Sequence, residues 1–87
     1  MSYQIELTRG AVKQLKKLPI DIRERIDLKI QELSVEPRPD GVKKLESELS
    51  IYRIRVGDYR VIYQIQDDIV LVTIVKVKHR KDVYRQK

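Results

Sequence analysis

The feature that most constrains the fold is the alternation of apolar and polar residues in the second half of the chain. Ile51–Val56 and Tyr59–Gln66 both alternate in this way, and a period of two residues is typical of strands with one buried face. Gly57 and Asp58 between them predict a two-residue hairpin turn with glycine first. We therefore expect an antiparallel hairpin.

Two further segments extend this sheet. Val42–Leu45 is a short strand candidate, and Ile69–Val77 is β-branched and apolar on both faces, which favours an interior strand. Asp67 and Asp68 are expected to form another two-residue turn before that strand.

The first forty residues predict a strand and a helical hairpin. Tyr3–Leu7 alternates as a strand, Thr8 is suited to cap the helix that follows, and Pro19 ends that helix. Asp21 is the expected N-cap of a second helix, whose apolar face carries Ile22, Ile26, Ile30 and Leu33. Glu36–Gly41 is rich in helix breakers and is expected to be a loop.

The expected fold class is therefore α+β, in the order β-α-α-β-β-β-β and in a single domain spanning residues 1–87. The N-terminal strand leads into a helical hairpin that packs on one face of a mainly antiparallel sheet.

Charge and composition restrict the function. The net charge is +6, and residues 41–87 hold 11 basic against 6 acidic side chains, so a polyanionic partner is expected, either nucleic acid or an acidic protein segment. The absence of cysteine excludes disulfides and thiolate metal sites. No segment has the pattern of a signal peptide or a membrane span, and we expect a cytoplasmic protein without membrane association.

Three arginines are expected on one face of the hairpin. With a two-residue turn Arg55 lies opposite Arg60, and Arg53 shares their face. Like charges in opposed positions destabilise a sheet by some tenths of a kcal/mol. One interpretation is a solvated basic face. The other is an anion site for a phosphodiester, because the planar guanidinium matches two phosphate oxygens.

The end of the chain is expected to join this cluster. If Asp67-Asp68 is a two-residue turn, the arginine face of the last strand carries Thr73, Val75 and Val77. The chain then leaves the sheet near His79 and brings His79, Arg80 and Tyr84 beside the arginines. Arg60 and Tyr84 are both expected to be exposed.

These residues suggest RNA cleavage without a metal or another cofactor. No carboxylate pair or His/Asp cluster has convincing metal-ligand spacing. RNA carries its own nucleophile, the 2′-hydroxyl, so an enzyme must orient it, neutralise the phosphorane and protonate the leaving 5′-oxygen.

The sequence resembles the RelE/ParE toxin superfamily, and its RelE branch in particular. The likeness rests on Y-R-I-R-V-G-D-Y-R-V-I-Y-Q-I from Tyr52 and on H-R-K-D-V-Y-R from His79, and it runs from the opening Y-Q-I-E-L to Tyr84. It implies a microbial-ribonuclease-like domain, the toxin of a type II toxin–antitoxin system, which cuts messenger RNA in the ribosomal A site by 2′-hydroxyl attack and inhibits translation.

The resemblance also implies roles. Arg53 and Arg55 match basic positions that stabilise the transition state, and Arg60 matches the phosphate-binding arginine. Arg80 matches an arginine proposed as general acid or leaving-group stabiliser, and Tyr84 matches a tyrosine proposed to orient the 2′-hydroxyl. The expected RNA contacts are Arg53, Arg55, Arg60, Lys78, Lys81 and Arg85.

One departure from the family concerns the general base. The best-known members carry lysines at the positions of Arg53 and Arg55, and an arginine cannot release a proton because its pKa exceeds about 12. The base must then be Tyr84 or His79, the latter resembling the catalytic histidine of some sister toxins.

The implied partners are a neutralising antitoxin with an acidic amphipathic helix, the ribosome with its messenger RNA, and operator DNA only through the antitoxin. The antitoxin would lie across the sheet or displace the C-terminal tail. Two alternatives stay open: a ParE-like toxin that inhibits DNA gyrase by protein binding, and an inert remnant or DNA-binding corepressor.

Overall fold

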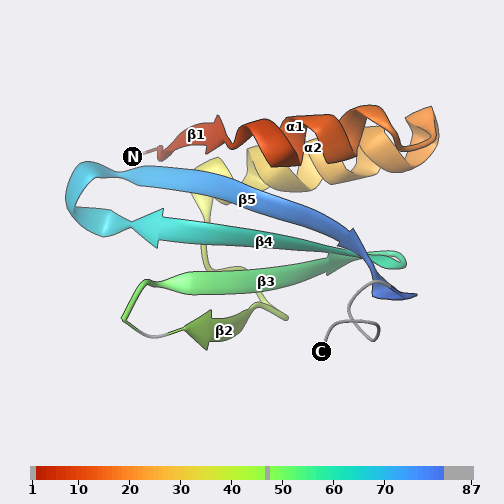
Figure 1. Cartoon of the computed structure of the whole chain (residues 1–87). Helices are drawn as coiled ribbons and strands as arrows, with labels where there is room; N and C mark the ends of the chain where they lie inside the picture. The colour runs from red at the N-terminus through yellow and green to blue at the C-terminus, as the bar shows by residue number, and fades with distance from the viewer. Residues whose placement is uncertain (1, 47, 82–87) are drawn as a thin grey trace.

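The computed structural model describes residues 2–46 and 48–81, so Tyr84 and Arg85 lie outside the described residues. Its elements, shown in Figure 1, are β1 (Gln4–Leu7), α1 (Arg9–Lys16), α2 (Ile20–Val35), β2 (Lys43–Glu46), β3 (Ile51–Val56), β4 (Tyr59–Gln66), the 3-10 turn η1 (Asp67–Ile69) and β5 (Leu71–His79). The predicted order of elements is confirmed.

The described strands form one five-stranded sheet in the order β1-β5-β4-β3-β2. β1 is parallel to β5, and the remaining neighbours are antiparallel. The last strand is therefore interior, as its apolar composition predicts. α1 and α2 lie together on one side of this sheet (Figure 1) and leave the other side, which we call the open face, without a helix among the described residues.

The start of α1 follows the prediction and the start of α2 does not. Thr8 Oγ1 accepts a hydrogen bond from the Ala11 backbone N–H at 3.1 Å, as an N-cap should. Asp21 was expected to cap α2, but the N-cap is Pro19, whose carbonyl accepts from the Arg23 N–H at 3.0 Å. Asp21 lies within the first turn, where its negative charge interacts favourably with the helix dipole and stabilises the helix.

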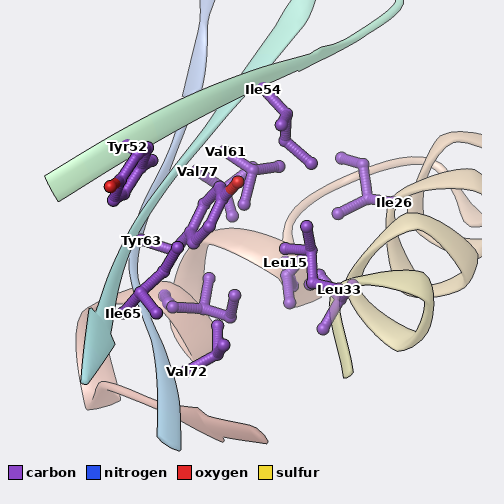
Figure 2. Close-up of a cluster of buried hydrophobic side chains, with 13 residues drawn as sticks. Leu15, Ile26, Leu33, Tyr52, Ile54, Val61, Tyr63, Ile65, Val72 and Val77 are labelled. Carbon is purple, nitrogen blue, oxygen red and sulfur yellow. The ribbon is translucent and has the colours of Figure 1, made fainter. Parts of the chain in front are cut away.

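The core lies between the sheet and the two helices. In Figure 2, Val61, Tyr63 and Ile65 of β4 are in one cluster with side chains from both helices. Tyr63 is fully buried, and its hydroxyl donates to the Pro37 carbonyl at 2.8 Å, which satisfies the one polar group that this ring carries into the core.

An ionic and aromatic network joins the loop after α2 to the far end of the sheet. Arg38 makes two hydrogen bonds to the Asp67 carboxylate, at 2.8 and 3.3 Å, and a third from Nε to the Tyr52 hydroxyl at 3.1 Å. The Tyr3 hydroxyl donates to the same carboxylate at 2.6 Å. The hydrogen bonds from Arg38 and then Tyr3 lower the pKa of Asp67 to about 2.

The β3–β4 hairpin has the predicted register. Val56 pairs with Tyr59, Arg55 with Arg60 and Arg53 with Ile62. Gly57 has a φ of +60°, a left-handed value that glycine adopts without steric strain.

The β4–β5 connection corrects two predictions. Asp67 and Asp68 do not form a two-residue turn: η1 and Val70, in the left-handed region, fill the connection between Gln66 and Leu71. A bulge then shifts the register, because Ile62 pairs with Lys76 whereas Tyr63 pairs with Ile74. Thr73, opposite Gln64, stays on the open face, but Val77 lies opposite Val61 in the core.

Backbone hydrogen bonding explains the bulge. β1 ends beside Ile74, so the outer edge of β5 beyond that residue needs other partners. α1 supplies them: Thr8 Oγ1 donates to the Val75 carbonyl at 2.8 Å, and Gln14 Oε1 accepts from the Val77 N–H at 2.7 Å. The bulge therefore lies where the edge of β5 changes from strand pairing to side-chain partners.

Candidate active site

Two rows of cations cross the open face, because opposed residues on neighbouring strands share a face. One row joins Arg55, Arg60 and Lys78, and the other joins Lys43, Arg53 and Lys76, with Ile62 between the last two. We call these six cations the basic face. The register brings together the three arginines that the sequence predicts on one face, and the bulge adds Lys76, which the sequence did not indicate.

Arg60 lies at the centre of the basic face, on the middle strand of the sheet. Its exposed fraction is 6%, so the prediction that Arg60 is exposed is wrong. Arg53 and Arg60 both have interactions within the chain. A buried cation needs compensation by other polar groups, and Arg60 also presents a positive charge opposite the more exposed Arg55 on the neighbouring strand.

A pocket of about 200 Å³ opens beside Arg60, and we call it the arginine pocket. Its lining residues are Arg55, Gly57, Asp58, Tyr59, Arg60 and Arg80. Three of the predicted site arginines therefore meet at one hollow, next to the β3–β4 turn. The arrangement suits an anion, because several guanidinium groups can donate to the oxygens of one phosphate.

Arg80 is held at this pocket by the turn. Its backbone N–H donates to the Asp58 carbonyl at 2.7 Å, while its Nη1 lies 4.0 Å from Asp58 Oδ1. Both side chains are more than half exposed, so the ion pair is weak and leaves the guanidinium able to turn toward a bound anion.

Arg53 lies outside the arginine pocket. It lines a neighbouring hollow of about 250 Å³ together with Arg55, Lys29, Asp40 and Gly41. Arg55 borders both hollows, which therefore adjoin along β3.

His79 does not join the arginines, contrary to the expected placement. It pairs with Tyr59 on the helix side of the sheet, where its ring meets the Tyr59 ring edge-on at 5.0 Å. It lines a different hollow with Gln14, Lys17 and Leu18. The bulge is the physical reason, because a slip of one residue moves every later side chain to the opposite face.

The remaining predicted contacts differ in position. Lys78 belongs to the basic face and is half-buried. Lys81 is exposed beyond the end of β5. The predicted roles of Tyr84 and Arg85 fall on residues outside those described. Sequence reasoning missed Lys43 and Lys76 as members of the basic face. Lys76 could be assigned to it only from the register of β5 against β4, and the apolar pattern of β5 does not reveal that register.

Two further properties concern the described part of the chain. Within residues 2–46 and 48–81, no group of three or more His, Asp or Glu side chains is arranged to hold a metal ion. None of the helices described there is long and apolar enough to cross a membrane.

A family model and similar proteins of known family all relate this chain to the toxins of type II toxin–antitoxin systems. The model of the ParE toxin of type II toxin–antitoxin systems (parDE) matches residues 5–84. The toxin RelG of Mycobacterium tuberculosis is 38% identical over 88 residues, covering 99% of this chain and 100% of that protein. The mRNA interferase toxin RelE of Escherichia coli is 30% identical over 90 residues, covering 99% of this chain and 94% of that protein.

A solved structure agrees. A chain of the archaeal RelE–RelB complex from Pyrococcus horikoshii has a TM-score of 0.84 and 35% identity, covering 92% of this chain and 97% of that chain. The family model takes its name from ParE, whereas these relatives carry RelE-type names. The chain thus belongs to the RelE/ParE toxin superfamily and is a type II toxin of the RelE kind.

Proposed function

We propose that this toxin is a metal-independent endoribonuclease that cuts messenger RNA in the ribosomal A site and thereby stops translation. The observation that carries the proposal is the meeting of Arg55, Arg60 and Arg80 at one pocket. The similarity to a protein named mRNA interferase toxin RelE supports the same reaction. Ribosomes and their messenger RNA are cytoplasmic, so we place the toxin in that compartment.

The arginines supply positive charge where the reaction develops negative charge. Arg60, fixed by burial, and Arg55 bind the non-bridging oxygens of the scissile phosphate and stabilise the phosphorane. Arg80, exposed at the rim, stabilises the leaving 5′-oxygen. Arg53 holds the adjacent phosphate from the neighbouring hollow.

The bond changes follow from RNA itself. The 2′-oxygen attacks the adjacent phosphorus, its proton passes to a base, and the P–O5′ bond breaks. The 5′-oxygen takes up a proton, and the products are a 2′,3′-cyclic phosphate and a 5′-hydroxyl. No arginine can serve as the base, and we assign the orientation of the 2′-hydroxyl to Tyr84. The flanking RNA phosphates contact Lys76, Lys78, Lys81 and Arg85.

We also propose a protein antitoxin as the neutralising partner. The structural neighbours include RelE–RelB complexes from P. horikoshii and E. coli. The basic face complements an acidic segment as well as RNA, so one surface serves both the substrate and the inhibitor. Operator DNA would be bound only through the antitoxin.

The test is cleavage of end-labelled messenger RNA on programmed ribosomes, with the cut sites mapped by primer extension. The wild-type protein should produce new 5′ ends within the A-site codon, and Arg55→Ala/Arg80→Ala should not. The matched control is Arg9→Ala/Lys13→Ala, which removes the same charge from exposed positions of α1 and should cleave normally. Intact messenger RNA with the wild-type protein, or gyrase-dependent DNA breaks in induced cells, would contradict the proposal.

Metal independence has its own measurement. Sulfur replaces a non-bridging oxygen of the scissile phosphate, which gives a phosphorothioate. Cleavage is then followed in the Mg²⁺ that ribosomes require, with and without added Mn²⁺. Arginine contacts predict a slower reaction that Mn²⁺ does not restore. Restoration by Mn²⁺ would assign the charge stabilisation to a metal ion.

A further inference from the structure

His79 ends β5 with a hydrogen bond that runs forward along the chain. Its Nδ1 accepts from the backbone N–H of Lys81 at 3.1 Å, two residues further on. Arg80 and Lys81 have helical backbone conformation. A side-chain acceptor that takes the N–H of the second helical residue is the defining contact of an N-cap, and here an imidazole supplies it in place of the usual Ser, Thr, Asn or Asp.

The imidazole is itself fixed on the side of the sheet opposite the basic face. Its ring lies perpendicular to that of Tyr59, with centroids 5.0 Å apart, and the hollow around it includes Gln14 and Leu18. Accepting through Nδ1 requires the neutral tautomer with its proton on Nε2. The packing therefore fixes the orientation of the His79 ring, and the position of Nδ1 in turn fixes the direction of the Lys81 N–H.

Arg80 lies between two such constraints. The Asp58 carbonyl holds its N–H at 2.7 Å, and the His79 cap holds the next residue. Tyr59 borders the arginine pocket on one side and contacts His79 on the other, so the cap and the pocket share a wall.

We propose that His79 is a positioning residue: its imidazole caps the turn that leaves β5 and thereby aims Arg80 at the arginine pocket. For its effect on cleavage this inference rests on the proposed nuclease function. It gives the histidine a role without proton transfer to or from the RNA.

Three variants separate capping from packing. His79→Asn keeps an acceptor of N-cap type but loses most of the ring, His79→Leu keeps apolar bulk without an acceptor, and His79→Phe keeps an aromatic ring against Tyr59 without an acceptor. If capping matters, amide exchange measured by NMR should leave the Lys81 N–H protected in wild type and His79→Asn and unprotected in the other two. In wild type, the imidazole nitrogen shifts should report the Nε2–H tautomer.

The same variants are then compared in single-turnover cleavage on programmed ribosomes. His79→Leu and His79→Phe should cleave about fivefold more slowly, the factor that an ordinary N-cap corresponds to, and His79→Asn should stay within about twofold of wild type. Affinity for the ribosome should change little, because the histidine lies on the face away from the basic face.

Two outcomes would overturn the inference. Equal protection of the Lys81 N–H in wild type and His79→Leu would show that the imidazole is no cap. Cleavage by His79→Phe at the wild-type rate would show that the ring packs without positioning. Failure of the nuclease proposal is distinct from both, since it appears as absent cleavage by the wild-type protein while the exchange experiment still reports on the cap.

Discussion

Arg60 carries a permanent positive charge, and yet its exposed fraction is only 6%. The exposed cations of the basic face can follow a ligand as it moves, whereas Arg60 is held by its surroundings on the middle strand. A fixed donor needs no reorganisation when charge develops on a phosphate, and this is the property that makes preorganised sites effective.

We predict that Arg60→Met lowers the single-turnover rate by roughly 100- to 1,000-fold, the effect of removing one preorganised donor from a transition state. Methionine keeps the apolar stem and so avoids most of the cavity that alanine would leave. The rate is measured by quench-flow on programmed ribosomes, and circular dichroism with thermal unfolding checks the fold. Arg60→Met cleaving within a few-fold of wild type, in a folded protein, would remove Arg60 from the chemistry.

At the scale of elements, the two hairpins show what the sequence can and cannot predict. A two-residue turn with glycine first allows one register, so Arg53, Arg55 and Arg60 could be assigned to one face from the sequence. The run from Ile69 to Val75 is apolar on both faces, and its pattern does not reveal where the alternation slips. Lys76 was therefore missed, and His79 was expected on the wrong face.

The cause of that slip lies in another element, which a local pattern cannot report. Gln14 on α1 accepts from the Val77 N–H, and Thr8 donates to the Val75 carbonyl. These bonds join residues 63 and 67 positions apart. The bulge is thus a tertiary feature, and it decides which side chains of β5 reach the basic face.

We predict that Gln14→Met destabilises the fold by about 1–2 kcal/mol, because the Val77 N–H loses its partner in a partly buried position. The free energy of unfolding is measured by urea denaturation. The control is Gln31→Met, at an exposed position of α2, which should change stability little. Equal effects of the two substitutions would mean that the Gln14 hydrogen bond does not stabilise the bulge.

The β4–β5 connection makes stability depend on pH. The pKa of Asp67 falls from 3.8 to about 2, through hydrogen bonds from Arg38 and Tyr3. Because the folded pKa lies below the unfolded value, the carboxylate stabilises the fold above about pH 4, and this contribution is lost as the pH falls toward about 2.

Asp67→Asn should accordingly be less stable than wild type at pH 6, and the difference should shrink as the pH falls from about 4 to about 2. Urea unfolding at a series of pH values measures it. Asp68→Asn, at the exposed neighbouring position, is the control and should follow the wild-type curve. A gap between wild type and Asp67→Asn that stays constant down to pH 2 would exclude this carboxylate as the source.

At the scale of the whole molecule, the pairing of the strands determines where the positive side chains lie. The net charge of +6 is not spread evenly, because the strand registers collect six cations on the open face. A polyanion that binds there releases counterions, so its affinity must fall with salt.

For single-stranded RNA, each phosphate contact contributes about 0.7 to the slope of log affinity against log salt. We predict that Lys76→Gln lowers the magnitude of that slope by about this amount. Fluorescence anisotropy with a labelled RNA oligonucleotide over a range of salt concentrations gives the slope. Lys13→Gln, which removes a charge from α1 on the other side of the sheet, should leave it unchanged, and an equal loss in both variants would point to net charge alone.

The pairing of β1 with β5 joins the beginning of the chain to its end. β5 lies between β1 and β4, and it also leads into Arg80 at the wall of the pocket. β1 and β4 therefore become part of one sheet only after Leu71–His79 has been synthesised, because β5 is made later than both of its neighbours. Until then β1 has no strand to pair with, and the sheet is completed by a strand that must insert between two segments already made.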